Sequence, residues 1–221
     1  KLFRADPLYE GGATAALQLP TCLGNHDAGR FAAAIRKSMP KALPDEVVKR
    51  DMLGHAMLLT LRGVPTIYSG DEQGFAGKGA DQDARQDMFA SQVASYNDEP
   101  LVGTSATTAQ ANFDTRHPLY QEIADLAHIR TAHPALTRGL QLVRFASDKP
   151  GLFAVSRFEP GTGREMLLLF NTSTEPLRAN VRVETRSKEF DVLAGSCPLN
   201  AQAPGSVEVE LPGLGYAVCN A

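Results

Sequence analysis

Apolar and polar positions follow two different rhythms along the chain, one before residue 139 and one after it. In the first part, short apolar runs at residues 17–23 and 64–68 enclose a helical stretch that begins near Asp45. Apolar residues recur in this stretch at the spacing of a helix that is covered on most sides. A further helix is expected to begin at Pro118, because proline suits the first turn. The order strand, helix, strand predicts a βαβ unit of a parallel sheet.

After residue 139 the pattern becomes one of short strands with apolar and charged positions in alternation. Turn signals rich in glycine and proline separate seven such runs. They are 141–147, 152–159, 165–174, 177–185, 188–194, 206–211 and 216–219. Short strands at this spacing predict an antiparallel β-sandwich. We therefore divide the chain into an α/β part, 1–138, and an all-β part, 139–221.

Polar side chains follow each of the two expected parallel strands. Asn25, His26 and Asp27 come directly after the first strand, and Asp71 and Glu72 come just beyond the second. Because ligands bind at the carboxyl ends of parallel strands, these residues are candidates for one site. The first three supply donors and acceptors suited to a polyhydroxylated ligand. The alternative is an Asx-type turn that caps the following helix.

Composition excludes several classes of function. The net charge is -3, so the chain has no basic footprint for nucleic acid. No apolar run approaches the roughly 18 residues that a membrane helix needs. The five histidines are scattered, so we expect no metal site in this chain. The first residue is Lys1 rather than methionine, which suggests a processed, trimmed or partial product.

The three cysteines show no metal or redox spacing. Cys22, Cys197 and Cys219 form no CxxC pattern, and their odd number argues against a disulfide framework. We interpret them as small buried apolar residues, with a Cys197–Cys219 bridge left open.

Three motifs and the all-β tail together carry a resemblance to a known family. The motifs are Leu23-Gly24-Asn25-His26-Asp27, then Gly63-Val64-Pro65-Thr66-Ile67-Tyr68-Ser69-Gly70-Asp71-Glu72, then Asp83-Ala84-Arg85-Gln86-Asp87-Met88-Phe89. In this combination the chain resembles the C-terminal portion of the α-amylase family of glycoside hydrolases and transglycosidases. The resemblance implies the last two βα units of a TIM (β/α)₈ barrel, with strands and helices seven and eight, followed by a C-terminal antiparallel β-sandwich. Ser69 departs from the aromatic residue common at its position.

The resemblance also implies roles for the polar residues after the first strand. Asp27 would stabilise the transition state of a retaining mechanism on α-glucosidic linkages of starch, maltooligosaccharides or related α-glucans. His26, Asn25 and Arg30 would bind the substrate. Arg30 would either pair with Asp27 or face solvent.

The nucleophile and the general acid/base of the family have no matching segment in this chain. We therefore expect residues 1–221 alone to be inactive. Their partner would be the N-terminal half of the barrel, in the same parent chain or in trans. No cofactor is expected in this chain, and a calcium ion is left open for the rest of the parent enzyme.

Some alternatives stay open at this point. The β-sandwich could serve a non-catalytic carbohydrate-binding or docking module, which exposed aromatic platforms would favour. The aromatic residues of that part fall mostly at positions expected to be buried. Asp71 and Glu72 are expected to order their loop, Arg85 and Asp87 to hold the following one together, and His55 to be a satisfied core histidine. The compartment is open, with secretion or the periplasm favoured over the cytoplasm.

Overall fold

The computed structural model describes residues 15–198 and 201–221, and these form two compact units. The β-rich unit comprises residues 59–64 and 128–221 together with the segment that ends at Leu19, and the helical unit comprises residues 20–58 and 65–127. No helix in the described part of the chain has the length and apolar character needed to cross a membrane. The boundary at residues 138 and 139 stays a prediction.

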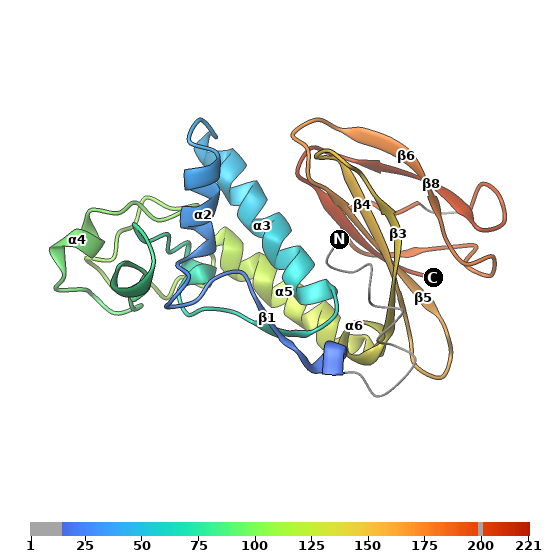
Figure 1. Ribbon diagram of the computed structural model, residues 1–221, viewed down its shortest axis with the longest axis horizontal. Coiled ribbons are helices and arrows are strands. Elements are labelled where there is room, and N and C mark those ends of the chain that lie inside the picture. The colour runs from blue at the N-terminus through green and yellow to red at the C-terminus, as the bar shows by residue number, and fades with distance from the viewer. Residues whose placement is uncertain (1–14, 199–200) are drawn as a thin grey trace. The chain divides into compact units, whose positions relative to one another are not determined.

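Two short neighbouring strands and three longer helices form the framework of the first part of the chain. Strands β1, Pro20–Cys22, and β2, Val64–Thr66, pair in a two-stranded sheet. The longer helices are α2 (Phe31–Ser38), α3 (Pro44–Thr60) and α5 (Pro118–Ala132) (Figure 1). Helices α3 and α5 were predicted, and α2 was not. The order strand, helix, strand is therefore confirmed.

The first strand is shorter than its apolar run. Residues 15–18 form a 3₁₀ helix, η1 (Ala15–Gln18), and β1 begins at Pro20, just after Leu19, whose carbonyl oxygen accepts a hydrogen bond from the N–H of Val64 at 2.9 Å. Proline has no N–H to donate, so it is tolerated at the first residue of a strand but not in its middle. Gly63 has φ 111° and directly precedes β2, three residues after α3 ends at Thr60.

A long excursion separates β2 from α5. It contains two 3₁₀ helices, η2 (Asp71–Gln73) and η3 (Asp81–Ala84), and one short helix, α4 (Ala94–Asn97). Apolar residues from α2, α3, the excursion and the start of α5 form one core. They are Ala32, Ile35, Val47, Ala76, Val102 and Leu119. Through Ala76 and Val102, this core packs the excursion against α2, α3 and the start of α5.

Two buried arginines satisfy carbonyl groups at the C-terminal end of α3. Arg130 donates to the carbonyl oxygens of Leu59 at 2.7 Å and Gly63 at 2.6 Å, and Arg157 donates to that of Thr60 at 3.0 Å. The last carbonyls of a helix have no partner within the helix, so these bonds replace water. Burial lowers the pKa of Arg130. After α5, the short helix α6 (Pro134–Arg138) leads into the strands.

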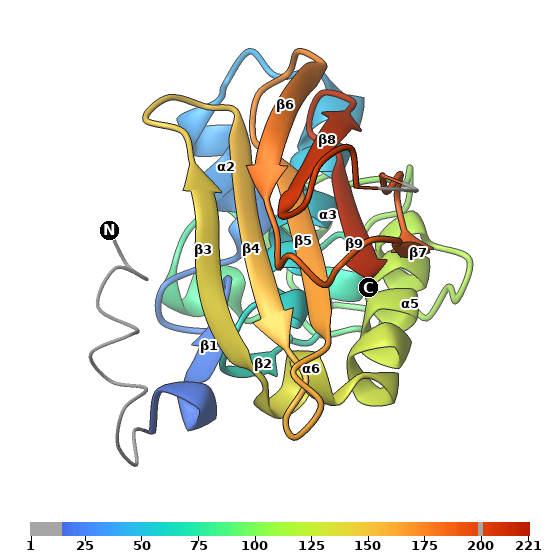
Figure 2. The same ribbon diagram turned by 90° about the vertical axis from the view of Figure 1, so that its right-hand side faces the viewer.

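All seven predicted strands of the all-β part are present, with small shifts at their ends. They are β3 (Leu140–Ala146), β4 (Leu152–Phe158), β5 (Glu165–Asn171), β6 (Leu177–Arg182), β7 (Asp191–Ala194), β8 (Ser206–Leu211) and β9 (Tyr216–Asn220). One sheet has the order β3-β4-β5-β9-β7, and β6 pairs with β8 in a second (Figure 2). Each of these strand pairs is antiparallel.

The two antiparallel sheets contribute to one hydrophobic core. Leu167 and Leu169 of β5 and Ala217 of β9 belong to the same buried cluster as Val207 and Val209 of β8. These positions alternate along their strands, so the other face of β8 carries the charges Glu208 and Glu210. The predicted alternation of apolar and charged positions is confirmed.

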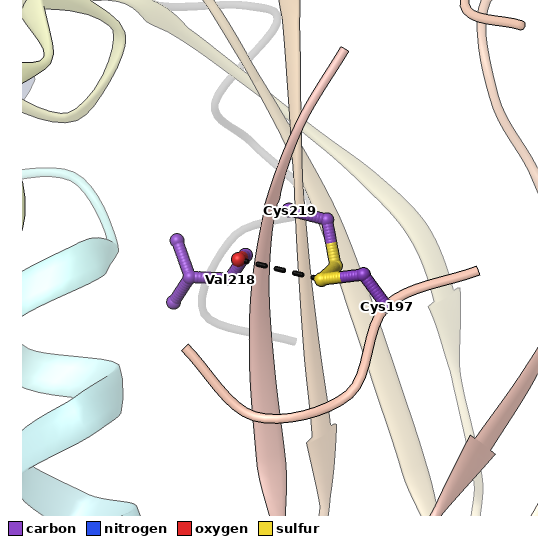
Figure 3. The surroundings of a disulfide bond; sticks show 3 residues. All are labelled: Cys197, Val218 and Cys219. Atoms are coloured by element: carbon purple, nitrogen blue, oxygen red, sulfur yellow. Dashed lines mark hydrogen bonds between the residues drawn. A yellow bond between two sulfur atoms is a disulfide. The ribbon is translucent and has the colours of Figure 1, made fainter. Parts of the chain in front are cut away.

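The Cys197–Cys219 bridge that the sequence left open is present, and the interpretation of Cys22 as a buried residue was wrong. Cys197 and Cys219 form a disulfide bond with their Cα atoms 5.7 Å apart, and Cys22 is exposed (Figure 3). The Cys197 sulfur lies 3.4 Å from the carbonyl oxygen of Val218, which is a packing contact because a disulfide sulfur carries no hydrogen. A separation of 22 residues carries no local sequence signal for a disulfide bond. The two cysteines meet because the strand before Cys197, β7, pairs with β9, which contains Cys219.

Candidate functional site

A tight turn follows β1 and presents two polar side chains to solvent. The backbone N–H and carbonyl of Asn25 bond to those of Gly29 at 3.1 and 3.0 Å. The side-chain oxygen of Asn25 accepts hydrogen bonds from the N–H groups of Asp27 at 2.9 Å and Ala28 at 2.7 Å. Gly29 has φ 95°, which suits glycine. Asn25 therefore forms an Asx-type turn, as the alternative interpretation stated.

The side chains of the other two candidate residues, His26 and Asp27, take no part in the hydrogen bonds of the turn. The side chains of His26 and Asp27 are 55% and 73% exposed, and His26 Nε2 lies 3.3 Å from Asp27 Oδ1. The N-cap residue of α2 is Arg30, so none of the three caps that helix. An imidazole and a carboxylate are thus held side by side, both open to a ligand.

An arginine from the excursion faces the same carboxylate. Arg85 Nη2 lies 3.8 Å from Asp27 Oδ1, and Asp81 holds the guanidinium through contacts of 2.7 and 3.2 Å to one carboxylate oxygen. The hydrogen bond that Arg85 donates to Asp81 is the main cause of the raised pKa of Arg85. Asp87 accepts a bond from the N–H of Phe89 at 2.8 Å. The predicted loop-ordering role of Arg85 and Asp87 is confirmed.

Arg30 neither pairs with Asp27 nor faces solvent, so both expectations for its partner were wrong. Its side chain is 0% exposed and bonds to Asp71 Oδ1 at 3.1 Å. It also donates to the carbonyl oxygens of Ser69 and Gln86, each at 2.9 Å, and to the side chain of Gln86 at 3.2 Å. Its guanidinium lies 4.3 Å from the ring centroid of Tyr68. Arg30, in the loop after β1, is therefore bonded to the loop after β2 and to the excursion.

Burial dominates the electrostatics of this pair. It lowers the pKa of Arg30 and raises that of Asp71 to about 6, in each case against the attraction of the partner. Both shifts favour the neutral form, which is the usual consequence of removing charges from water. Glu72 accepts a hydrogen bond from the N–H of Gly70 at 2.9 Å, so the predicted loop-ordering role of Asp71 and Glu72 is confirmed.

His55 lies in the core, as predicted, but it is only half satisfied. Its Nδ1 lies 2.9 Å from Oδ1 and 3.0 Å from the carbonyl oxygen of Asp51. Its Nε2 is buried with no hydrogen-bond partner within the described residues. Burial acts to lower the pKa of His55, but the hydrogen bond and charge of Asp51 outweigh it and raise the pKa.

Two contacts of this site, Asp81 with Arg85 and Gln86 with Arg30, were not predicted from the sequence. Asp81 was not singled out, although its i,i+4 spacing to Arg85 is a recognisable signal for an ion pair. Gln86 belongs to a quoted motif, but nothing local indicated that it would bond to Arg30, which is 56 residues earlier. Within 15–198 and 201–221, no group of three or more acidic, histidine or cysteine residues is placed to hold a metal ion. A calcium ion in a parent enzyme stays a prediction.

The aromatic residues of the all-β part offer no paired platform among the described positions. Phe145 is exposed, Phe153, Phe158 and Tyr216 are half-buried, and Phe170 and Phe190 are buried. Phe153 instead stacks on Phe170 at 6.0 Å between ring centroids. The expectation that most of these rings are covered is confirmed.

Comparison with known proteins identifies the family. The model of the alpha-amylase catalytic domain matches residues 12–139. The chain is 44% identical over 179 residues to an alpha-amylase of Streptomyces lividans, which covers 80% of this chain and 20% of that protein. It is 34% identical over 115 residues to a beta/alpha-amylase of Paenibacillus polymyxa, covering 52% of this chain and 7% of that protein. The chain thus spans about a fifth or less of these relatives.

Solved structures show the same fold. An Anoxybacillus alpha-amylase matches with a TM-score of 0.72 and 19% identity, over 100% of this chain and 42% of that one. The alpha-amylase of Geobacillus thermoleovorans, solved with acarbose, matches with a TM-score of 0.67 and 19% identity, over 92% and 39%. The match of the family model, the sequence relatives and the fold agree: the chain belongs to the alpha-amylase family of glycoside hydrolases.

Proposed function

We propose that this chain is the C-terminal part of an enzyme that cleaves α-glucosidic linkages of starch, maltooligosaccharides or related α-glucans by a retaining mechanism. The observation that carries the proposal is the exposed His26–Asp27 pair, held by the Asn25 turn directly after β1 and faced by Arg85. Here Asp27 accepts hydrogen bonds from ring hydroxyls of the sugar at the cleavage point. A fixed anion beside developing positive charge stabilises the transition state.

The other predicted site residues have supporting roles in this proposal. His26 binds the same sugar, because its ring is exposed beside Asp27. Asn25 shapes the turn, since its side-chain oxygen is already bonded to two backbone N–H groups. Arg30 acts on the substrate only through the loops that it holds, because its guanidinium is buried.

The proposal assigns bond cleavage to residues outside this chain. A retaining glycosidase needs a nucleophile and a general acid whose pKa is raised. Asp71 has a raised pKa, but its side chain is 6% exposed and faces Arg30, so it does not meet a sugar. Residues 1–221 would thus support a transition state that other residues generate.

The exposure of β1 and β2 supports a partner that continues the sheet. Strands of a (β/α)₈ barrel are buried on both faces, and closure of a barrel needs more than two strands. In both strands the end residues are exposed and the middle residue is only half-buried. We propose that β1 and β2 are the last two strands of such a barrel, completed by an N-terminal half in the same chain or in trans. The two antiparallel sheets then form the C-terminal β-sandwich.

The compartment is also a proposal. The Cys197–Cys219 disulfide supports secretion or the periplasm, because disulfides persist in oxidising compartments. We place the parent enzyme there.

Two activity measurements test the proposed function. In the full-length parent, Asp27→Asn should lower kcat on maltooligosaccharides by at least about 100-fold, the order found when one transition-state contact is lost. Asp148→Asn, which alters an exposed carboxylate in the turn between β3 and β4, is the matched control and should leave kcat unchanged. Equal rates for the parent and the Asp27 variant would refute the role of Asp27.

The second measurement concerns the chain alone. Purified residues 1–221 should not turn over starch, maltooligosaccharides or an aryl glucoside. Turnover that disappears in the Asp27→Asn variant of the same chain would show that 1–221 is catalytically complete, contrary to the proposal.

A further inference from the structure

Two phenylalanine rings of the excursion are exposed and in contact with each other. Phe89 is 70% exposed and Phe113 is 53% exposed, with ring centroids 5.2 Å apart and planes at 64°. Single exposed apolar residues are common and need no explanation. Here two segments 24 positions apart bring their rings together in solvent, where burial of each would be worth about 2 kcal/mol.

The backbone beside both rings is held by hydrogen bonds. Asn112 N–H donates to the carbonyl oxygen of Met88 at 2.8 Å, which ties together the residues that precede the two phenylalanines. Asp114, which follows Phe113, is bonded through its N–H and carbonyl to the side chain of Gln73 at 2.9 and 3.1 Å. Gln73 and Asn112 are themselves buried. The rings are therefore positioned in advance, which reduces the entropy lost when a ligand binds.

Phe113 also borders a polar cavity of about 850 Å³. The cavity is lined mainly by amide, hydroxyl and backbone groups, including the side chains of Gln110 and Ser105, whereas the amide N–H groups of Asn112 already donate to the carbonyl oxygens of Thr107 and Gln110. Its charged residues Asp114 and Arg116 pair with each other at 3.2 Å, so the cavity offers no uncompensated charge from that pair. His117 is used within the fold, since its two ring nitrogens bond to the backbone of Val102 and Leu119.

This combination indicates the chemistry of the ligand. Aromatic faces bind the apolar C–H face of a sugar ring, and amides and hydroxyls bond to its hydroxyl groups. An anion would need free cationic groups, and an apolar peptide would leave the polar lining without partners. A neutral polyhydroxylated ligand satisfies both halves of the surface.

The rings are connected to the Asp27 site through a short segment. Arg85, which faces Asp27, precedes Phe89 by four residues, so their Cα atoms are at most about 14 Å apart. A few sugar units of one chain span such a distance. We propose that Phe89, Phe113 and the adjacent cavity bind glucose units of an α-glucan chain outside the Asp27 site, as an extended binding platform. This inference rests on the proposed function and names a further part of its substrate site.

The first experiment measures binding separately from turnover. Isothermal titration with maltoheptaose uses the full-length protein in an Asp27→Asn background, so that the ligand is not consumed. Phe89→Ala and Phe113→Ala should each weaken binding by about tenfold, and Phe113→Trp, which keeps an aromatic face, should retain the affinity. The matched control is Phe145→Ala on β3, an exposed phenylalanine that is not among the residues lining the cavity, which should bind as the parent does.

A second measurement distinguishes the platform from a general defect. Phe113→Ala should raise KM for soluble starch by a larger factor than KM for maltotriose, because a short substrate has fewer glucose units to place on the platform. The removed rings are exposed, so thermal midpoints should stay within a few degrees of the parent's. Cellohexaose, with β-linkages, should bind at least tenfold more weakly than maltoheptaose.

Three results would overturn the inference: unchanged maltoheptaose affinity in both alanine variants, an equal loss in Phe145→Ala, or equal affinity for cellohexaose. The failure of the proposed function would look different. In that case Asp27→Asn would leave α-glucan turnover unchanged. Failure of the platform alone would instead show as lost turnover in Asp27→Asn together with unchanged maltoheptaose affinity in both alanine variants.

Discussion

Arg30 provides the sharpest test of how this site is held, because one side chain joins three segments of the helical unit. The segments are its own turn after β1, the loop after β2 through Ser69 and Asp71, and the excursion through Gln86. We consider the substitution Arg30→Met, which keeps an unbranched apolar stem of similar length. The change removes the charge and all donors while limiting the cavity that it leaves.

The expected cost follows from the groups that lose their partner. Asp71 would remain buried without its cation, and breaking a buried ion pair in this way costs about 3–5 kcal/mol. The carbonyl oxygens of Ser69 and Gln86 would lose donors, and the cation–π contact with Tyr68 would be lost as well. We expect a loss of about 5 kcal/mol in the free energy of unfolding of the helical unit, a large part of the total for a domain.

The assay is urea unfolding, with amide hydrogen exchange in α2 and α3 as the probe of the helical unit. Arg36→Met in α2 is the matched control, because Arg36 is 32% exposed and pairs with Glu99 at 3.3 Å. That variant should lose no more than about 1 kcal/mol. The double variant Arg30→Met with Asp71→Asn should recover about 2 kcal/mol, because the unpaired buried charge is then gone.

A loss below about 1 kcal/mol in Arg30→Met would show that the buried pair contributes little. Additive losses in the double variant would show that Arg30 and Asp71 are not coupled. Either result would refute the view that Arg30 organises the loops around Asp27.

The remaining predictions concern pH, the disulfide and one glycine. The pKa of Asp71 is about 6 in the folded protein and about 3.9 in an unfolded chain, so its contribution to stability is present below pH 4 and is lost as pH rises through 6. The stability of the parent relative to Asp71→Asn should therefore fall by about 2–3 kcal/mol between pH 4 and pH 7 in urea titrations, and a flat difference would contradict the shift. Reduction of Cys197–Cys219, which closes a loop of 22 residues, should lower the stability of the β-rich unit by about 3 kcal/mol, measured as the urea midpoint with and without dithiothreitol in a Cys22→Ser background; equal midpoints would count against it. Gly74→Ala should be strongly destabilising, because φ is 73° and a Cβ would clash with the carbonyl of Val102. Gly161→Ala, with φ 86° and open space around it, should cost only about 1 kcal/mol. Thermal melts of the two variants measure the difference.

Much of the secondary structure could be predicted because it depends on local spacing. The helices at Pro44 and Pro118 and the seven later strands follow from periodicity, prolines and turn residues. The misses have local causes too. The apolar run at 17–23 was interpreted as one strand, but its start belongs to the 3₁₀ helix η1 and β1 begins only at Pro20, a residue tolerated at the start of a strand. Helix α2 was missed because it is short and has no side-chain cap.

The candidate site was predicted in part. The motif around Asp27 located the turn, and the structure exposes His26 and Asp27 as a ligand site requires. Of the two alternatives for Asn25-His26-Asp27, the Asx-type turn is present, because the Asn25 side chain accepts two backbone N–H bonds, whereas a sugar site stays a prediction. The sugar-binding roles themselves stay proposals.

What the sequence alone determined was the order of elements, the family and the position of the polar residues after each strand. These depend on residues that are close in sequence or on motifs that keep a fixed spacing. Only the tertiary structure decided that Arg30 is buried against Asp71, that Cys197 pairs with Cys219, and that Phe89 and Phe113 meet in solvent. The physical reason is the same in each case: the partners lie 22 to 41 residues apart, and only packing of the chain decides whether a charge, a thiol or an aromatic ring is buried or exposed.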